Sequence, residues 1–159
     1  MGTLPAPDQR FFEDYVPGER YEFGHRVVDE TELVDFARRY DPQPFHTDPQ
    51  AAAATPYGGL ITSGWHTCAM MMRMMVDHYV SAVASLGSPG VDELRWVKPV
   101  RPGDVLRVRI TILDARVSQS KPDRGLVRSA IEVLNQDDAT VMTMKTLGFF
   151  LRRDYPGTA

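Results

Sequence analysis

The stretch SGWHTCAMMMRMMVDHYV, residues 63–80, decides the fold. Its apolar residues recur at the spacing of a helix, and methionines at positions 70, 71, 74 and 75 widen the apolar stripe well beyond one face. This spacing predicts one long helix from Ser63 to about Leu86. Since a helix that is apolar on so many sides is normally covered by other structure, we expect the rest of the chain to wrap around it.

Strand-like runs follow this helix. The clearest is VLRVRITIL, residues 105–113, which alternates apolar residues with arginine and threonine, as a half-buried antiparallel strand does. Its apolar positions are Leu106, Val108, Ile110 and Ile112. A Pro-Gly turn at 101–104 and a longer loop at 118–125 separate this run from its neighbours. The pattern predicts four strands in a meander, over 90–100, 105–113, 126–136 and 140–152.

The first third of the chain predicts one strand and two shorter helices. A strand is expected near Arg20 to Val28, and an amphipathic helix over 30–40 with Asp29 or Thr31 as its cap. Asp48 and Pro49 suit the start of a short helix over 49–54. The fold class is therefore α+β, a curved antiparallel sheet around one long central helix, in a single domain over residues 1–159.

Composition narrows the function classes. The formal net charge of −3 argues weakly against nucleic acid, which favours basic faces. The chain has one cysteine, Cys68, so no internal disulfide forms and a reducing compartment is expected. The run MMMRMMV is too short to span a bilayer, and MGTLPAPDQRFF lacks the apolar run of a signal peptide. We expect a cytoplasmic protein that binds neither nucleic acid nor membrane.

The segment RRYDPQPFHTDP, residues 38–49, places Asp41 and His46 five positions apart with two prolines between them. One interpretation is a rigid loop in which Asp41 ends a helix and His46 is solvated. The other is an acid/base pair, since histidine titrates near neutrality and a carboxylate can orient a water molecule. Five extended residues span about 16 Å, so the pair requires a loop that folds back.

The run DPQPFH resembles the Asp-x-Asn-Pro-x-His motif of the MaoC-like dehydratases, the family of (R)-specific enoyl-CoA hydratases. The segments FEDYVPGERYEFG, ELVDFARRYD, HTDPQAAAATPYGGLITSGWH and VRPGDVLRV also resemble family segments, in family order. The resemblance covers about residues 11–150 and implies the hot-dog fold, in which a curved antiparallel sheet wraps one long helix.

The resemblance also implies roles for three residues. Asp41 and His46 match the residues that hold and activate water, and Gly64 matches the glycine whose N–H polarises the thioester carbonyl. The first N–H groups of a helix have no internal partner, so this glycine is suited to stabilise developing negative charge. The alternative for Gly64 is close helix packing beside Trp65.

Four neighbours are expected to border the substrate: Gln43, Phe45, Ser63 and Trp65. Two of them depart from the family pattern. Gln43 stands at the motif asparagine, so the hydrogen bonds that hold the loop must be rearranged. Ser63 stands where many of these hydratases have histidine, and we expect its hydroxyl to cap the long helix in preference to touching the acyl group.

The implied activity is a hydro-lyase reaction that interconverts a trans-2-enoyl-CoA and an (R)-3-hydroxyacyl-CoA. No cofactor or metal is expected, because the substrate itself carries coenzyme A. A homodimer or higher homo-oligomer is expected, with the substrate tunnel near the subunit interface. The alternatives are a hot-dog acyl-CoA thioesterase, which commonly carries a carboxylate on the long helix, and a non-catalytic acyl-thioester-binding subunit. That helix contains Asp77 but no glutamate.

Other polar residues are expected to have lesser roles. His66 and His78 lack partners at metal-ligand spacing, and Cys68 is expected to be packing. Basic residues after the long helix either meet the phosphates of coenzyme A or are solvated surface charges. They are Arg95, Lys98, Arg101, Lys121 and Arg124.

Overall fold

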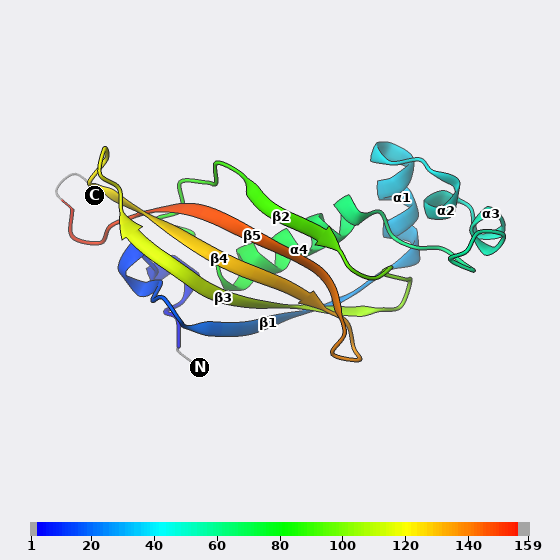
Figure 1. The fold of residues 1–159 in the computed structure, drawn as a ribbon, viewed down its shortest axis with the longest axis horizontal. Coiled ribbons are helices and arrows are strands. Elements are labelled where there is room, and N and C mark those ends of the chain that lie inside the picture. The colour runs from blue at the N-terminus through cyan, green and yellow to red at the C-terminus, as the bar shows by residue number, and fades with distance from the viewer. Residues whose placement is uncertain (1–2, 156–159) are drawn as a thin grey trace.

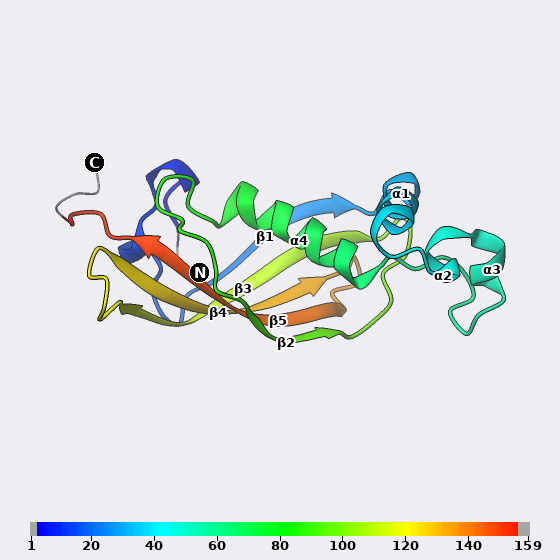
Figure 2. The ribbon, with the colours of Figure 1, turned by 90° about the horizontal axis from the view of Figure 1, so that it is seen from above.

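The computed structural model describes residues 3–155 and contains one five-stranded antiparallel sheet that curls around one long helix (Figures 1 and 2). Two short 3-10 helices, η1 (Pro7–Gln9) and η2 (Phe12–Asp14), precede the first strand. The other elements follow in the order β1 (Arg20–Val27), α1 (Glu30–Tyr40), α2 (Pro44–Thr47), α3 (Pro49–Ala53), α4 (Gly64–His78), β2 (Val91–Trp96), β3 (Val105–Val117), β4 (Arg124–Leu134) and β5 (Thr140–Leu151). This arrangement confirms the predicted α+β class and the hot-dog fold.

The core lies between the concave face of the sheet and the underside of α4. The alternation in β3 is confirmed, because Leu106, Val108, Ile110 and Ile112 are all at most 1% exposed. Met70, Met71, Met74 and Met75 supply the matching face of α4 and are also buried. Burial of each such side chain contributes about 1.5 to 3 kcal/mol, so this contact fixes the position of the helix on the sheet.

The strand order β1-β3-β4-β5-β2 corrects the predicted four-strand meander. Strands β3, β4 and β5 form a meander, but β2 pairs with β5, with Arg95 opposite Thr143 and Trp96 opposite Met142. Two prolines, Pro99 and Pro102, lie in the link between β2 and β3 and lack the N–H that a hairpin ladder needs. The link therefore crosses an end of the sheet, and the Thr62 N–H donates to the Val100 carbonyl on the way (2.8 Å).

Helix α4 ends at His78, and the prediction that it continues to about Leu86 is wrong. The N–H groups of Tyr79 and Val80 both donate to the Met75 carbonyl, and the wider bond from Val80 ends the regular helix. The chain then turns at Ser81, whose hydroxyl accepts from the Ala84 N–H (2.8 Å) and donates to the Arg10 carbonyl (2.6 Å). The apolar residues beyond 80 therefore belong to a loop that packs on the N-terminal segment.

The outer face of α4 is open, contrary to the expectation of a helix covered on every side. Trp65, Met72 and Val76 are each about half exposed. The apolar stripe is thus wider than the surface that one sheet covers.

Both predicted helix starts before α4 are confirmed. The Asp29 carboxylate accepts from the Glu32 N–H at the start of α1, and Asp48 accepts from the N–H groups of Gln50 and Ala51 at the start of α3. Helix α2 was not predicted. All three helices lie beyond one end of the sheet, at the end where α4 begins, and α3 is the farthest from α4 (Figure 1).

Within residues 3–155, no helix is long and apolar enough to cross a bilayer. The single domain over 1–159 stays a prediction, and residues 1–2 and 156–159 lie outside the described part of the chain.

A buried guanidinium closes the far end of α4. Arg10 is 2% exposed, and it donates to the carbonyls of His78 (3.2 Å), Tyr79 and Pro5 (3.0 Å from Nε). It thus satisfies carbonyls that the end of a helix leaves without partners and complements the negative end of the helix dipole.

We expect Arg10→Met to lower the free energy of unfolding by about 2 to 4 kcal/mol, since the partly buried carbonyls of Pro5 and His78 lose their donor and an acceptor left without one costs about 1 to 3 kcal/mol. The measurement is urea denaturation followed by circular dichroism. Arg73→Met is the matched control: the Arg73 side chain is 67% exposed and pairs with Asp77 on the same helix, so the expected change is below about 1 kcal/mol. Equal stability of Arg10→Met and the natural protein would contradict the role of Arg10.

Candidate functional site

A cleft of about 430 Å³ lies beside the first turn of α4, between α2 and the link that follows β2. Six of the seven predicted site residues line it: Asp41, Gln43, Phe45, His46, Gly64 and Trp65. The seventh, Ser63, is completely buried behind the cleft wall. The structure therefore brings together residues from the 38–49 segment and from the start of the long helix.

The loop that carries Asp41 and His46 folds back, as the acid/base interpretation requires. The Gln43 N–H donates to the Asp41 carbonyl (2.8 Å), and the His46 N–H donates to the Gln43 carbonyl (2.9 Å). Pro44 occupies the first position of α2, where its fixed φ suits a helix and no donor is needed. As a result, His46 Nε2 lies 3.3 Å from Asp41 Oδ2.

The imidazole of His46 is held in one tautomer. Its side chain is 6% exposed, and Nδ1 lies 2.7 Å from the carbonyl oxygen of Ile61. A carbonyl only accepts, so Nδ1 carries a hydrogen and donates it. This leaves Nε2, on the side of Asp41, as the nitrogen that can gain or release a proton.

The carboxylate of Asp41 is held by two donors. The Ser63 hydroxyl donates to Oδ2 (2.7 Å) and the Gln43 side-chain amide donates to Oδ1 (2.7 Å). These bonds, Ser63 foremost, hold the pKa of Asp41 below its usual value, and the neighbouring His46 acts in the same direction. Asp41 is therefore ionised at neutral pH.

The predicted capping role of Ser63 is wrong, because its side chain makes no hydrogen bond to the helix it precedes. An ionised carboxylate is a stronger acceptor than a neutral group and takes the hydroxyl hydrogen. Gln43, at the position of the motif asparagine, reaches back to Asp41 with its side-chain amide.

Gly64 is the first residue of α4. Within residues 3–155, no acceptor bonds to the N–H of Gly64 or of Trp65, and the positive end of the helix dipole lies at these groups. The glycine also allows close packing, because a Cβ at this position would collide with the indole of Trp96. That indole donates to the Gly64 carbonyl (3.0 Å), so the packing partner is Trp96 and not the predicted Trp65.

Sequence reasoning missed three contributors to the cleft. They are the Ile61 carbonyl, the Trp96 indole and the ring of Tyr57, which lies against Phe45 (5.5 Å between centroids). Ile61 contributes a main-chain atom, and the tertiary structure brings the side chains of Trp96 and Tyr57 to the site. The sequence therefore carries no local signal for them.

Of the basic residues considered for phosphate contacts, Lys98 lines the cleft. Arg101 donates to the Tyr57 carbonyl (2.5 Å), and Arg124 pairs with Asp123 (2.7 Å).

Cys68 is half-buried, and burial raises the pKa of its thiol, as expected for a packing residue. No cluster of three metal-ligating side chains occurs among the described residues.

The curled sheet, the central helix and the polar cleft at its start define a hot-dog domain. Residues 13–133 match the family described as "MaoC like domain". The chain therefore belongs to the MaoC-like dehydratase family, as the sequence resemblance indicated.

Known relatives agree with this assignment. A solved MaoC-like dehydratase from Rhodospirillum rubrum is 38% identical, with a TM-score of 0.84 over 92% of this chain and 99% of that one. Protein MaoC of Klebsiella aerogenes is 30% identical over 66% of this chain, which spans 31% of that protein's length. The 3-hydroxyacyl-thioester dehydratase Z of Mycobacterium tuberculosis is 29% identical over 58% of this chain and 62% of its own length.

We expect Ser63→Ala to raise the pKa of Asp41 toward its usual value of about 4, since the variant loses the strongest donor to the carboxylate. The measurement is the pH titration of the Asp41 carboxyl carbon by NMR. The depressed pKa stabilises the folded state above about pH 4, the unfolded pKa, and this contribution is lost as the pH falls through the folded-state pKa. The stability difference between natural protein and variant should therefore shrink at low pH. An unchanged titration would show that the hydroxyl does not hold Asp41.

Proposed function

We propose that this protein hydrates a trans-2-enoyl-CoA to the (R)-3-hydroxyacyl-CoA and catalyses the reverse dehydration. One observation carries the proposal: His46 Nε2 lies 3.3 Å from the ionised carboxylate of Asp41, in the same cleft as the Gly64 N–H, which has no acceptor among residues 3–155. Family membership and the named activity of the mycobacterial relative support the reaction class. The R configuration follows from the resemblance alone.

The reaction begins with a water molecule between Asp41 and His46. The water donates one hydrogen bond to Asp41 Oδ2 and one to His46 Nε2, which lie 3.3 Å apart. Its oxygen bonds to C3 of the substrate while one proton passes to Nε2. The imidazolium that forms is stabilised by the adjacent carboxylate. The same proton then passes to C2, which completes the addition of water across the double bond.

This scheme makes His46 the proton carrier. Asp41 accepts hydrogen bonds from Ser63 and Gln43, which favour its ionised form and oppose its protonation. Its part is to orient the water and to stabilise the charged imidazole.

The start of α4 serves the other end of the substrate. As C3 is attacked, the π electrons move toward the thioester oxygen, which becomes enolate-like. The Gly64 N–H donates to that oxygen and, because it is fixed before the reaction, stabilises the transition state more than the ground state. A donor of this kind contributes about 3 to 4 kcal/mol. The scheme needs no metal or separate cofactor, and Lys98 is the candidate contact for a coenzyme A phosphate.

No observation favours the thioesterase. Asp77, the carboxylate on the long helix, pairs with Arg73 (3.0 Å) and does not line the cleft that contains the Asp–His pair. The non-catalytic binding subunit remains an outcome of the assay below.

The assay supplies crotonyl-CoA and follows both the enoyl absorbance and free thiol. We expect the absorbance to fall without thiol release. Thiol release would instead indicate a thioesterase. If neither signal changes across a panel of CoA thioesters of varied chain length, the protein is a binding subunit.

Two substitutions test the pair itself. We expect Asp41→Asn and His46→Ala each to lower kcat by about 100- to 10,000-fold, the usual contribution of a positioned acid or base. Asp77→Asn and His78→Gln, on the exposed side of α4, serve as matched controls and should retain activity. Circular dichroism checks that each variant is folded. Full activity in either site variant would refute the assigned roles.

We also propose a homodimer that uses the open face of α4 and the edge strand β2. Strand β2 ends the sheet, and Val91 and Trp96 on it are about half exposed, as are Trp65 and Met72 on α4. Exposed apolar residues on an edge strand, beside an apolar helix face, favour pairing with a second copy. Trp65 and Trp96 also line the cleft, so the partner would lie close to the substrate.

Met72→Glu tests this interface, because it places a charge on the apolar face. We expect the variant to be monomeric at concentrations at which the natural protein is dimeric, as measured by light scattering after gel filtration. Leu113→Glu is the control, since Leu113 is 45% exposed on β3, away from this face. A natural protein that is monomeric at micromolar concentration would contradict the proposal.

A further inference from the structure

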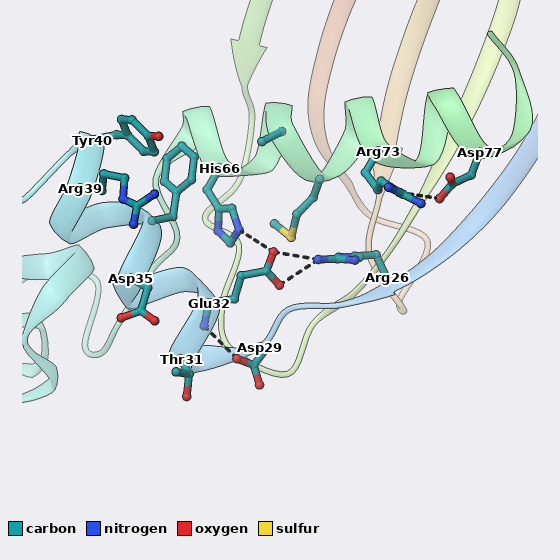
Figure 3. Close-up of a pocket in the computed structure, with 13 residues that line it drawn as sticks. Arg26, Asp29, Thr31, Glu32, Asp35, Arg39, Tyr40, His66, Arg73 and Asp77 are labelled. Atoms are coloured by element: carbon teal, nitrogen blue, oxygen red, sulfur yellow. Dashed lines mark hydrogen bonds and ion pairs between the residues drawn. The ribbon is translucent and has the colours of Figure 1, made fainter. Parts of the chain in front are cut away.

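His66 is a buried polar residue to which the proposed reaction assigns no part. A second cleft, of about 920 Å³, lies between α1, the end of β1 and α4 (Figure 3). His66 points toward it from the first turn of α4, Glu32 from α1 and Arg26 from β1. The histidine is 2% exposed, so its polar atoms depend on protein partners.

The two ring nitrogens of His66 have different partners. Nδ1 lies 2.8 Å from the Thr62 hydroxyl oxygen, whereas Nε2 lies 3.7 Å from Glu32 Oε1, too far for a hydrogen bond. Glu32 is itself engaged by Arg26 (2.7 and 2.9 Å), as Figure 3 shows. The ring of Phe36 stacks on the imidazole at 4.8 Å. The firm polar contact of His66 is therefore the one to Thr62.

The direction of that bond follows from the surrounding charge. Burial lowers the pKa of His66, which favours the neutral ring. A neutral imidazole carries one hydrogen, and the Glu32 carboxylate near Nε2 favours the tautomer with that hydrogen on Nε2. Nδ1 therefore accepts from the Thr62 hydroxyl.

Thr62 lies at the centre of the segment that holds the candidate acid/base pair. The Ile61 carbonyl accepts from His46, and the Ser63 hydroxyl donates to Asp41. Between them, the Thr62 hydroxyl bonds to His66. Segment 61–63 therefore hydrogen-bonds to Asp41 and His46 through its two outer residues and to His66 through its central residue.

We propose that His66 is a positioning residue: through Thr62 it fixes segment 61–63, and with it the separation of Asp41 from His46. This inference rests on the proposed function for its effect on rate, although the geometry itself does not. A displacement of about 1 Å in such a site costs about a hundredfold in rate. His66 does not touch the substrate in this role.

Two amide substitutions separate the nitrogens of the ring. The oxygen of asparagine takes the place of Nδ1, whereas glutamine places its amide nearer to Nε2. We expect His66→Gln to lower kcat about a hundredfold with little change in KM, because Thr62 loses its acceptor. We expect His66→Asn to retain most of kcat, because it preserves that acceptor.

A second measurement needs no substrate. In His66→Gln, the displaced Ser63 should release Asp41, so that the carboxyl titrates nearer to its usual pKa in the NMR experiment described above. His66→Asn should titrate as the natural protein does. His78→Gln, the same substitution on the exposed part of this helix, is the control for both measurements.

These results distinguish the outcomes. Natural kcat and natural Asp41 titration in His66→Gln would overturn the proposal. An equal loss of activity in both His66 variants, with an equally lowered unfolding midpoint, would assign His66 a purely structural role and would also overturn it. If His66→Gln does not fold, Thr62→Val removes the hydroxyl at the other end of the same bond and carries the test. If the natural protein is inactive on every thioester, the proposed function fails, while the Asp41 titration still decides the positioning role.

Discussion

Three consecutive residues, Ile61, Thr62 and Ser63, make the hydrogen bonds on which the cleft depends. Ile61 holds the His46 ring through its carbonyl (2.7 Å), and Ser63 holds the Asp41 carboxylate through its hydroxyl (2.7 Å). The segment is fixed in turn, since the Ile61 N–H donates to Phe45 (3.2 Å) and the Thr62 N–H to Val100 (2.8 Å). The spacing of two side chains on one loop is therefore set by a segment from elsewhere in the chain.

The polarity of the cleft follows from this arrangement. The 38–49 segment contributes an ionised carboxylate and an imidazole that can accept a proton, whereas the start of α4 contributes N–H groups without internal acceptors. These two sides suit a reaction in which a base acts at one end of a conjugated substrate and negative charge develops at the other end. The imidazole would serve the first end and the N–H groups the second. The burial of His46 strengthens these interactions, because little water competes with them.

How well the sequence predicts a feature depends on how far apart in the chain the residues that determine this feature lie. The alternation in β3 and the caps at Asp29 and Asp48 are local, and each was predicted correctly. The pairing of β2 with β5 and the end of α4 at His78 depend on residues far apart in the chain, and both were missed. The meeting of Asp41 and His46 was anticipated through the family resemblance, because their spacing alone allowed separation.

Within the site, the residues that hold the pair were the harder ones to foresee. Ile61 acts through its main chain, so its side-chain identity gives no clue. Ser63 was assigned to the nearest helix, although the carboxylate of Asp41 is the better acceptor for its hydroxyl.

The indole of Trp96 over Gly64 links the cleft to the rim of the sheet. Strand β2 is one of the two edge strands and has one neighbour in the sheet, so within one chain it is among the first parts to open when the domain fluctuates. Each such opening carries Trp96 away from the helix start and admits solvent to the Gly64 amide. The geometry of the cleft would thus tolerate less heat and denaturant than the methionine-lined interior, and the cleft would open before the fold is lost.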